Sequence, residues 1–194
     1  RWYRQMVGIA SVGDTTVVSN KWMLGTRNSF IIGISATFLA TALGTVAALG
    51  LSRPKMPFKG TIMAILISPM IVPLIITSAG MFFFYSKIGL THTYLGLILA
   101  HTALGTPFVV ITVTATLTGF DTNLIRASQS LGADTMRTFF KVIMPLILPG
   151  VISGALFAFI TSFDEVVVVM FVGSVEQITI PKQMWAGLRQ ETSP

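Results

Sequence analysis

Four stretches of this chain contain no Asp, Glu, Lys or Arg, and they limit its fold more than any other feature does. They cover residues 28–52, 60–86, 88–120 and 142–163. A helix that crosses the hydrocarbon core of a membrane needs about 20 consecutive apolar residues, and each stretch is long enough. We therefore expect an all-α membrane protein, a polytopic helical bundle in which four spans are visible.

The composition excludes several other classes of protein. Only 10% of the 194 residues are charged and 53% are hydrophobic, whereas a soluble domain has about 25% charged residues. The net charge of +6 comes from basic residues that lie between the apolar stretches, so we expect contacts with membrane lipid and no nucleic acid partner. The absence of cysteine excludes disulfides, thiolate metal sites and a cysteine nucleophile.

Two prolines place the last span. Pro145 and Pro149 interrupt the first third of the charge-free stretch 142–163, and proline disfavours a helix interior because it lacks the amide proton. We therefore begin the last helix after them, which puts Asp164 and Glu165 inside it. The four expected spans cover about residues 30–51, 61–85, 94–117 and 151–172, within a membrane core of residues 28–173.

The two flanks, residues 1–27 and 174–194, are too polar to cross a membrane. Four spans put both flanks on the same side, but the Lys and Arg residues are shared too evenly to orient the chain. Residue 1 is Arg rather than Met, so we expect the core of a longer protein. The second flank has an apolar stripe typical of a helix in the membrane interface, formed by Ile180, Met184, Trp185 and Leu188.

Small residues recur every four positions in the first expected span, at Ala36, Ala40, Gly44 and Ala48. Small side chains at this spacing let helix backbones approach closely within lipid. The stripe fits either a moving helix interface or static packing, and we favour static packing.

Residues 119–149, between the third and fourth spans, predict a helix, a break and a second helix. The first helix has its body at Leu124–Leu131, and Gly132 suits the left-handed conformation that closes it. Asp134 can cap the second helix, which Pro145 ends. The apolar side chains exposed on such a loop require a partner surface; they are Leu131, Ala133 and Phe139.

The residue pattern of this loop is similar to a known loop motif. It has Arg126-Ala127-Ser128, three residues, Gly132, nine residues, and then Val142-Ile143-Met144-Pro145. It resembles the cytoplasmic loop of type I ABC importer permeases, whose pattern is Glu-Ala-Ala, three residues, Gly, nine residues, Ile-x-Leu-Pro. The resemblance covers residues 28–190 and implies a six-span permease whose first and last helices lie outside this chain.

In that family the loop forms a coupling helix that docks in a cleft of a cytoplasmic ATPase subunit. The resemblance therefore implies that residues 119–149 are cytoplasmic and that residues 1–27 and 174–194 are extracytoplasmic or interfacial. It also implies a multi-pass protein of the bacterial inner membrane. The implied ATPase-docking residues are Arg126, Ala127, Ser128, Leu131, Gly132, Ala133 and Phe139.

The loop departs from the family pattern at several positions. Arg126 stands where the family has Glu, so either the ATPase partner offers an acid there or that contact is absent. An exposed ion pair contributes only about 0–1 kcal/mol, so we expect docking to survive. Ser128 replaces the second Ala of the pattern, and Val142 and Met144 replace Ile and Leu, which are mild changes.

The resemblance implies three kinds of protein partner: ABC ATPase subunits, a second permease subunit and an extracytoplasmic substrate-binding protein. This chain has no P-loop, because no lysine is followed by Ser or Thr. ATP and Mg are therefore expected on the ATPase, with no cofactor on this chain. The two histidines, His92 and His101, have no carboxylate between them, so we expect no metal site and no catalytic residue.

Asp164 and Glu165 lie near the centre of the last expected span. A charge there costs about 2.5–3.5 kcal/mol and usually faces an internal pathway or a partner. In one interpretation Ser162 and the two acids belong to a substrate pathway, where Asp164 attracts a cation and Glu165 holds the helix. In the other, both acids are structural. The run Ser-Phe-Asp-Glu-Val-Val-Val resembles spermidine/putrescine permeases, whereas sugar permeases often have Asn-Glu there.

We therefore interpret the chain as a transmembrane permease subunit of an ATP-driven ABC importer, not an enzyme, for polyamines or a related organic cation. A type I permease for a different small solute is the main alternative. An ATP-independent channel or carrier and a membrane enzyme are the others.

Overall fold

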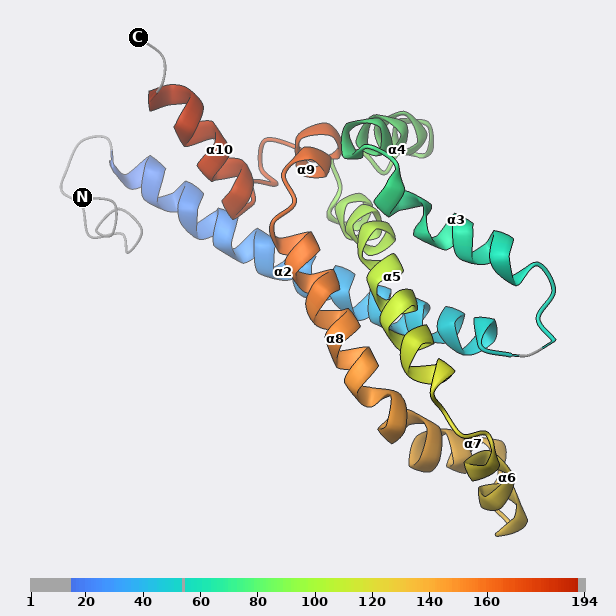
Figure 1. The fold of residues 1–194 in the computed structure, drawn as a ribbon. Coiled ribbons are helices and arrows are strands. Elements are labelled where there is room, and N and C mark those ends of the chain that lie inside the picture. The colour runs from blue at the N-terminus through green and yellow to red at the C-terminus, as the bar shows by residue number, and fades with distance from the viewer. Residues whose placement is uncertain (1–14, 54, 192–194) are drawn as a thin grey trace.

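The computed structural model describes residues 15–53 and 55–191, and every regular element among them is a helix (Figure 1). The expected all-α fold is confirmed for this part of the chain. One short element, η1, is a π-helical turn. In chain order the elements are α2 (Thr15–Leu51), α3 (Lys59–Ile71), α4 (Leu74–Ile88), α5 (Tyr94–Thr118), α6 (Asn123–Ser130), α7 (Thr135–Thr138), η1 (Phe139–Ile143), α8 (Met144–Phe163), α9 (Val167–Val172) and α10 (Ile180–Glu191).

Three helical segments among the described residues are long and apolar enough to cross a membrane. They are Lys21–Leu51 within α2, Tyr94–Thr118 (α5) and Thr135–Phe163, which joins α7, η1 and α8. The pair α3 and α4 makes a fourth span when it is counted as one, although it is bent by 104°. A polytopic helical membrane protein is therefore confirmed, with three or four candidate spans.

The first helix is longer than expected. α2 begins at Thr15 and runs to Leu51 without a break, so Lys21 and Arg27 belong to the same helix as the apolar segment. About 20 residues of a helix fill the hydrocarbon core, and the N-terminal turns of this one extend beyond it, where polar side chains are tolerated. The flank expected over residues 1–27 is thus helical from Thr15 onward, and residues 1–14 lie outside the described part.

The second expected span, residues 61–85, is broken into two helices. α3 ends at Ile71, Val72 is extended with a ψ of 134°, and α4 begins at Leu74 directly after Pro73. Proline lacks the amide proton and pushes the preceding residue out of the helical region. Pro73 therefore ends one helix and starts another.

The last span also differs from the expected residues 151–172. α8 begins at Met144 and ends at Phe163, with Pro145 in its first turn and Pro149 inside it. The π-helical turn η1 comes directly before it. Because π turns shift the hydrogen-bonding pattern, the helix passes Pro145 without stopping there.

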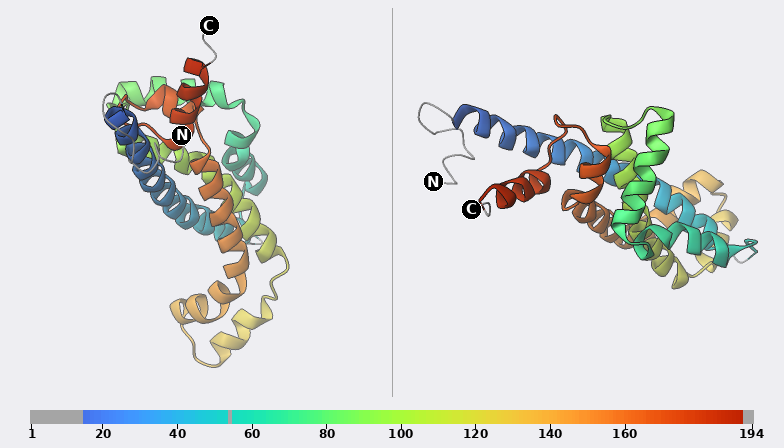
Figure 2. Two further views of the ribbon diagram at one scale, coloured as in Figure 1. Left: turned by 90° about the vertical axis from the view of Figure 1, so that its left-hand side faces the viewer. Right: turned by 90° about the horizontal axis from the view of Figure 1, so that it is seen from above.

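Helices α2, α5 and α8 pack together as the centre of the bundle (Figure 2). Val109 of α5 is fully buried and lies between two glycines. A methyl group added at Gly44 of α2 would lie 2.6 Å from Val109 Cβ, and one at Gly154 of α8 would lie 2.8 Å from Val109 Cα. The stripe that contains Gly44 thus packs against a neighbouring helix. Its other members, Ala36, Ala40 and Ala48, are buried too.

A polar network fixes the end of the bundle that holds α4, α9 and α10, opposite α6 and α7 (Figure 1). Asn28 Nδ2 donates to the carbonyl oxygens of Glu176 at 3.2 Å and Ile178 at 2.9 Å, and Tyr94 Oη donates to Asn28 Oδ1 at 2.9 Å. Lys182 Nζ donates to Ser174 O at 3.1 Å, and partial burial lowers the pKa of its ammonium group. The segment between α9 and α10 is therefore held in place by side chains from other elements.

The contact of Gly154 with α5 predicts a specific loss of stability. Gly154→Ala places a methyl group 2.5 Å from Thr112 Oγ1 and 2.8 Å from Val109 Cα, and such overpacking costs about 1–3 kcal/mol. We expect a lower thermal unfolding midpoint for the purified chain in lipid nanodiscs. Gly80→Ala in α4 is the control, because nothing lies within 4 Å of the added methyl group. Equal midpoints for the two variants would contradict the close α5–α8 contact.

Candidate functional site

The loop expected to dock an ATPase forms a helix, a tight turn and a second helix at one end of the bundle (Figure 1). Gly132, in the turn after α6, has a φ of +81°, the left-handed conformation that favours glycine. Asp134 Oδ1 accepts a hydrogen bond from Arg137 N at 2.7 Å and caps α7. Both capping predictions are therefore confirmed.

One part of this segment faces outward. Four of the predicted docking residues are exposed: Arg126, Ala127, Leu131 and Gly132. The Leu131 side chain is 89% exposed, which is unusual for a large apolar residue. Met136 and Phe140, in α7 and η1, are 63% and 59% exposed. Neither residue was among the docking residues predicted from the sequence, although their spacing of one helical turn was a usable signal.

The other predicted docking residues, Ser128, Ala133 and Phe139, are half-buried. Ser128 Oγ lies 2.9 Å from Thr138 Oγ1, at hydrogen-bonding distance, and Thr138 is only 3% exposed. The Phe139 ring packs edge-on against Phe140, with ring centroids 5.0 Å apart. The structure therefore divides the predicted docking set into an exposed group and a half-buried group.

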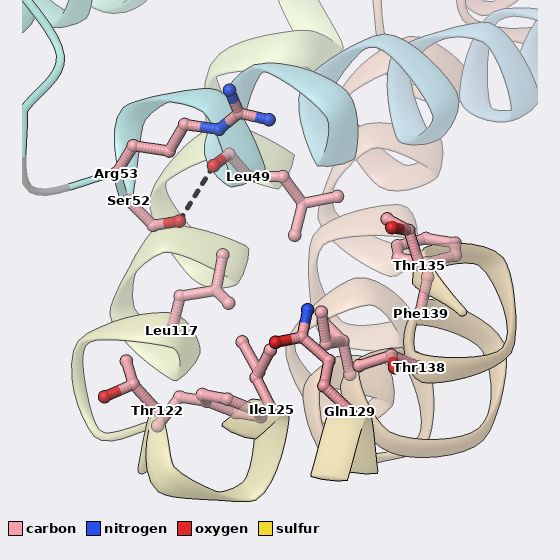
Figure 3. Close-up of a pocket in the computed structure, with 12 residues that line it drawn as sticks. Leu49, Ser52, Arg53, Leu117, Thr122, Ile125, Gln129, Thr135, Thr138 and Phe139 are labelled. Carbon is pink, nitrogen blue, oxygen red and sulfur yellow. Dashed lines mark hydrogen bonds between the residues drawn. The ribbon is translucent and has the colours of Figure 1, made fainter. Parts of the chain in front are cut away.

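A cavity of about 390 Å³ lies between the α6–α7 segment and the ends of α2 and α5 (Figure 3). Leu49 and Leu117 contribute apolar walls from the two long helices, and Ile125 contributes another from α6. Gln129, Thr135, Thr138 and Phe139 line it from the loop side (Figure 3). Of the half-buried docking residues, Phe139 therefore lines this cavity, beside the buried Thr138.

The three residues expected in a substrate pathway lie in different environments. Asp164 follows the last residue of α8 and is exposed, so it lies at the end of this helix and not near its centre. Glu165 is only 7% exposed, and its Oε1 accepts a hydrogen bond from Val168 N at 3.0 Å, which caps the start of α9. Ser162 is buried, and its Oγ lies 2.7 Å from His101 Nδ1. Of the three, Asp164 has the side chain open to a ligand.

Both histidines have local partners. His101 is 1% exposed and joins α5 to α8 through Ser162. His92 Nδ1 lies 3.2 Å from Gly173 O, and the His92 amide donates to Val172 O at 2.8 Å. The described residues contain no group of three or more His, Asp or Glu side chains that could hold a metal ion.

A family model for the binding-protein-dependent transport system inner membrane component matches residues 21–191. The chain belongs to this family. It is therefore a permease component of the inner membrane, as the sequence resemblance implies, and the family is one of non-catalytic membrane subunits. The match includes the α6–α7 segment and the break at Asp164.

Several curated relatives are named for polyamine transport. The permease is 31% identical over 167 residues to the spermidine/putrescine transport system permease protein PotC of Haemophilus influenzae, which covers 86% of this chain and 65% of that protein. It is 31% identical over 160 residues to PotC of Escherichia coli K12, covering 82% and 60%. It is 29% identical over 176 residues to the putrescine transport system permease protein PotI of the same strain, covering 86% and 62%. The permease thus spans less than two thirds of the length of these relatives.

The cap of α9 predicts different effects for two substitutions of Glu165. Glu165→Gln keeps an oxygen that can accept from Val168 N, whereas Glu165→Leu removes the acceptor. Loss of such a cap costs about 1 kcal/mol, so the Leu variant should unfold at a lower temperature than the Gln variant. Thermal unfolding of the permease in nanodiscs measures this. Equal losses in both variants would mean that the negative charge, and not the cap, stabilises this region.

Proposed function

We propose that this permease is a subunit of an ATP-driven ABC importer for spermidine, putrescine or a related polyamine. It works with ABC ATPase subunits, a second permease subunit that completes the pathway, and an extracytoplasmic substrate-binding protein. The observation that carries the substrate class is the identity of about 30% to relatives named for these polyamines. The exposed carboxylate of Asp164 supports it, because a polyamine carries ammonium groups that a carboxylate attracts.

The exposed face of the α6–α7 segment is the proposed ATPase-docking surface. Leu131, Met136 and Phe140 expose apolar area that a partner surface would remove from water. Arg126 and Arg137 add positive charge beside it, which favours an acidic rim on the ATPase. Ser128, Ala133 and Phe139, which are half-buried, support this face from within.

Asp164 is the proposed cation contact of the substrate pathway. It lies at the break between α8 and α9, and broken helices form the ion and substrate sites of many transporters. Glu165 keeps its carboxylate engaged with the α9 backbone, so its proposed role is to hold the break open beside Asp164. Ser162 has the same supporting role through its contact with His101.

Transport then follows from two conformations of the complex. Closure of the ATPase subunits on ATP moves the docked α6–α7 segment, and the loaded binding protein favours the same conformation from the other side. ATP and the loaded binding protein together shift the equilibrium between an inward-open and an outward-open pathway.

Docking predicts that Gly132→Asp abolishes uptake. Any side chain at a φ of +81° strains the turn, and a carboxylate there also alters the docking face. We expect loss of ATPase co-purification and of spermidine uptake in proteoliposomes, with membrane insertion unchanged. Gly119→Asp is the matched control, because Gly119 has a φ of −87° and its added Cβ meets no atom closer than 4.0 Å. Normal uptake in the Gly132 variant would reject the docking assignment.

The polyamine site predicts that Asp164→Asn weakens substrate recognition. Removing a charged hydrogen-bond acceptor costs about 1.5–3 kcal/mol, so the KM for radiolabelled spermidine should rise about tenfold or more. Glu176→Gln removes the same charge from an exposed side chain at the same end of the bundle and serves as the control. Unchanged spermidine kinetics in the Asn variant would reject Asp164 as the cation contact, and wild-type complexes that take up no spermidine would reject the polyamine assignment.

A further inference from the structure

The contact between Ser128 and Thr138 joins two helices of the α6–α7 segment. The hydroxyl oxygens lie 2.9 Å apart, with Ser128 on α6 and Thr138 as the last residue of α7. The backbone adds a second link, because Ala133 N donates to Ser128 O at 3.1 Å. Ser128 thus holds the turn through its carbonyl oxygen and the second helix through its side chain.

Thr138 connects this contact to the membrane span. It comes directly before η1, and helix continues from there through α8 to Phe163. Thr138 is 3% exposed and also lines the cavity beneath α6 (Figure 3). If α6 moved without the base of α8, the contact would break and a buried hydroxyl would lose its partner, which is unfavourable.

The hydroxyl of Ser128 is an addition to the loop pattern of the type I permeases, which has Ala at this position. Alanine there cannot reach Thr138 with a hydrogen bond, so the pattern does not require this contact for the fold. Ser128→Ala therefore removes the contact while introducing the residue that the pattern has.

We propose that Ser128 and Thr138 are positioning residues that make α6 and the start of α8 move as one body. The proposal rests on the proposed function, in which α6 docks the ATPase. With the contact intact, the ATPase subunits close only when the span helices move with them. With the contact removed, part of the motion of α6 is absorbed at the turn, and ATP is hydrolysed without movement of the spans.

The test uses the full-length permease assembled with its ATPase, second permease and binding protein in nanodiscs. The variants are Ser128→Ala, Thr138→Val and the double variant. Ser130→Ala is the matched control, because the Ser130 hydroxyl donates to Arg126 O within α6 and joins no second helix. The basal ATPase rate per assembled complex is measured without substrate, so the test does not depend on the polyamine assignment.

We expect each single variant to raise the basal rate about fivefold, the factor that corresponds to one hydrogen bond of about 1 kcal/mol. The double variant should give about the same factor as each single variant, since all three remove one shared contact. Stimulation by the loaded binding protein should fall by a similar factor. Ser130→Ala should leave the basal rate unchanged.

A purely structural role gives a different result. It lowers the amount of assembled complex and leaves the basal rate per complex unchanged, and this outcome would overturn the proposal. A failure of the proposed docking function gives another result. If the ATPase does not dock on the α6–α7 segment, Gly132→Asp leaves both the ATPase co-purification and the basal ATPase rate as in the wild type. If Gly132→Asp disrupts docking while Ser128→Ala behaves as Ser130→Ala does, the positioning role alone is rejected.

Discussion

The close approach of α5 to α2 and α8 is the interaction on which the rest of the structure depends. Lipid is as apolar as the side chains, so burial gives helices in a membrane little reason to associate, and they are held by short-range packing. Val109 supplies this packing on both sides, against Gly44 and Gly154. The three helices it joins carry the α6–α7 segment at one end and the break at Asp164 at the other, so this contact fixes the frame for both proposed sites.

Several polar side chains lie where helices begin or end. In the hydrocarbon region each backbone group must be satisfied within a helix, so a break needs side chains that replace the lost hydrogen bonds. Glu165 Oε1 binds Val168 N at the start of α9, Lys182 Nζ binds Ser174 O after its end, and Asn28 Nδ2 binds Ile178 O before α10. A chain with 10% charged residues therefore uses several of its polar groups to end helices.

The sequence predicted two kinds of feature: the membrane helices, which depend on hydrophobicity averaged over many residues, and the turns, which depend on a few local residues. Charge-free stretches identified the membrane helices, and Gly132 and Asp134 identified the turn after α6. The start of α8 was misplaced because the rule that proline stops a helix assumes α-helical hydrogen bonding, whereas a π-helical turn precedes Pro145. The contact of Ser128 with Thr138, and the different surroundings of Asp164 and Glu165, depend on which elements meet in three dimensions, and no spacing in the sequence encodes them.

One helical segment joins the two proposed sites. Thr135–Phe163 contains 29 residues, of which α8 forms 20. A helix rises about 1.5 Å per residue, so α8 alone is about as long as the hydrocarbon core is thick. The first turns of the segment carry Thr138, and Asp164 follows its last residue. A helical connection transmits displacement from one end to the other more directly than a loop does, and the π-helical turn η1 and Pro149 are the places where this one can bend. Movement imposed at the proposed docking surface therefore has a direct mechanical route to the proposed cation contact, provided that α6 is held firmly to the base of this helix.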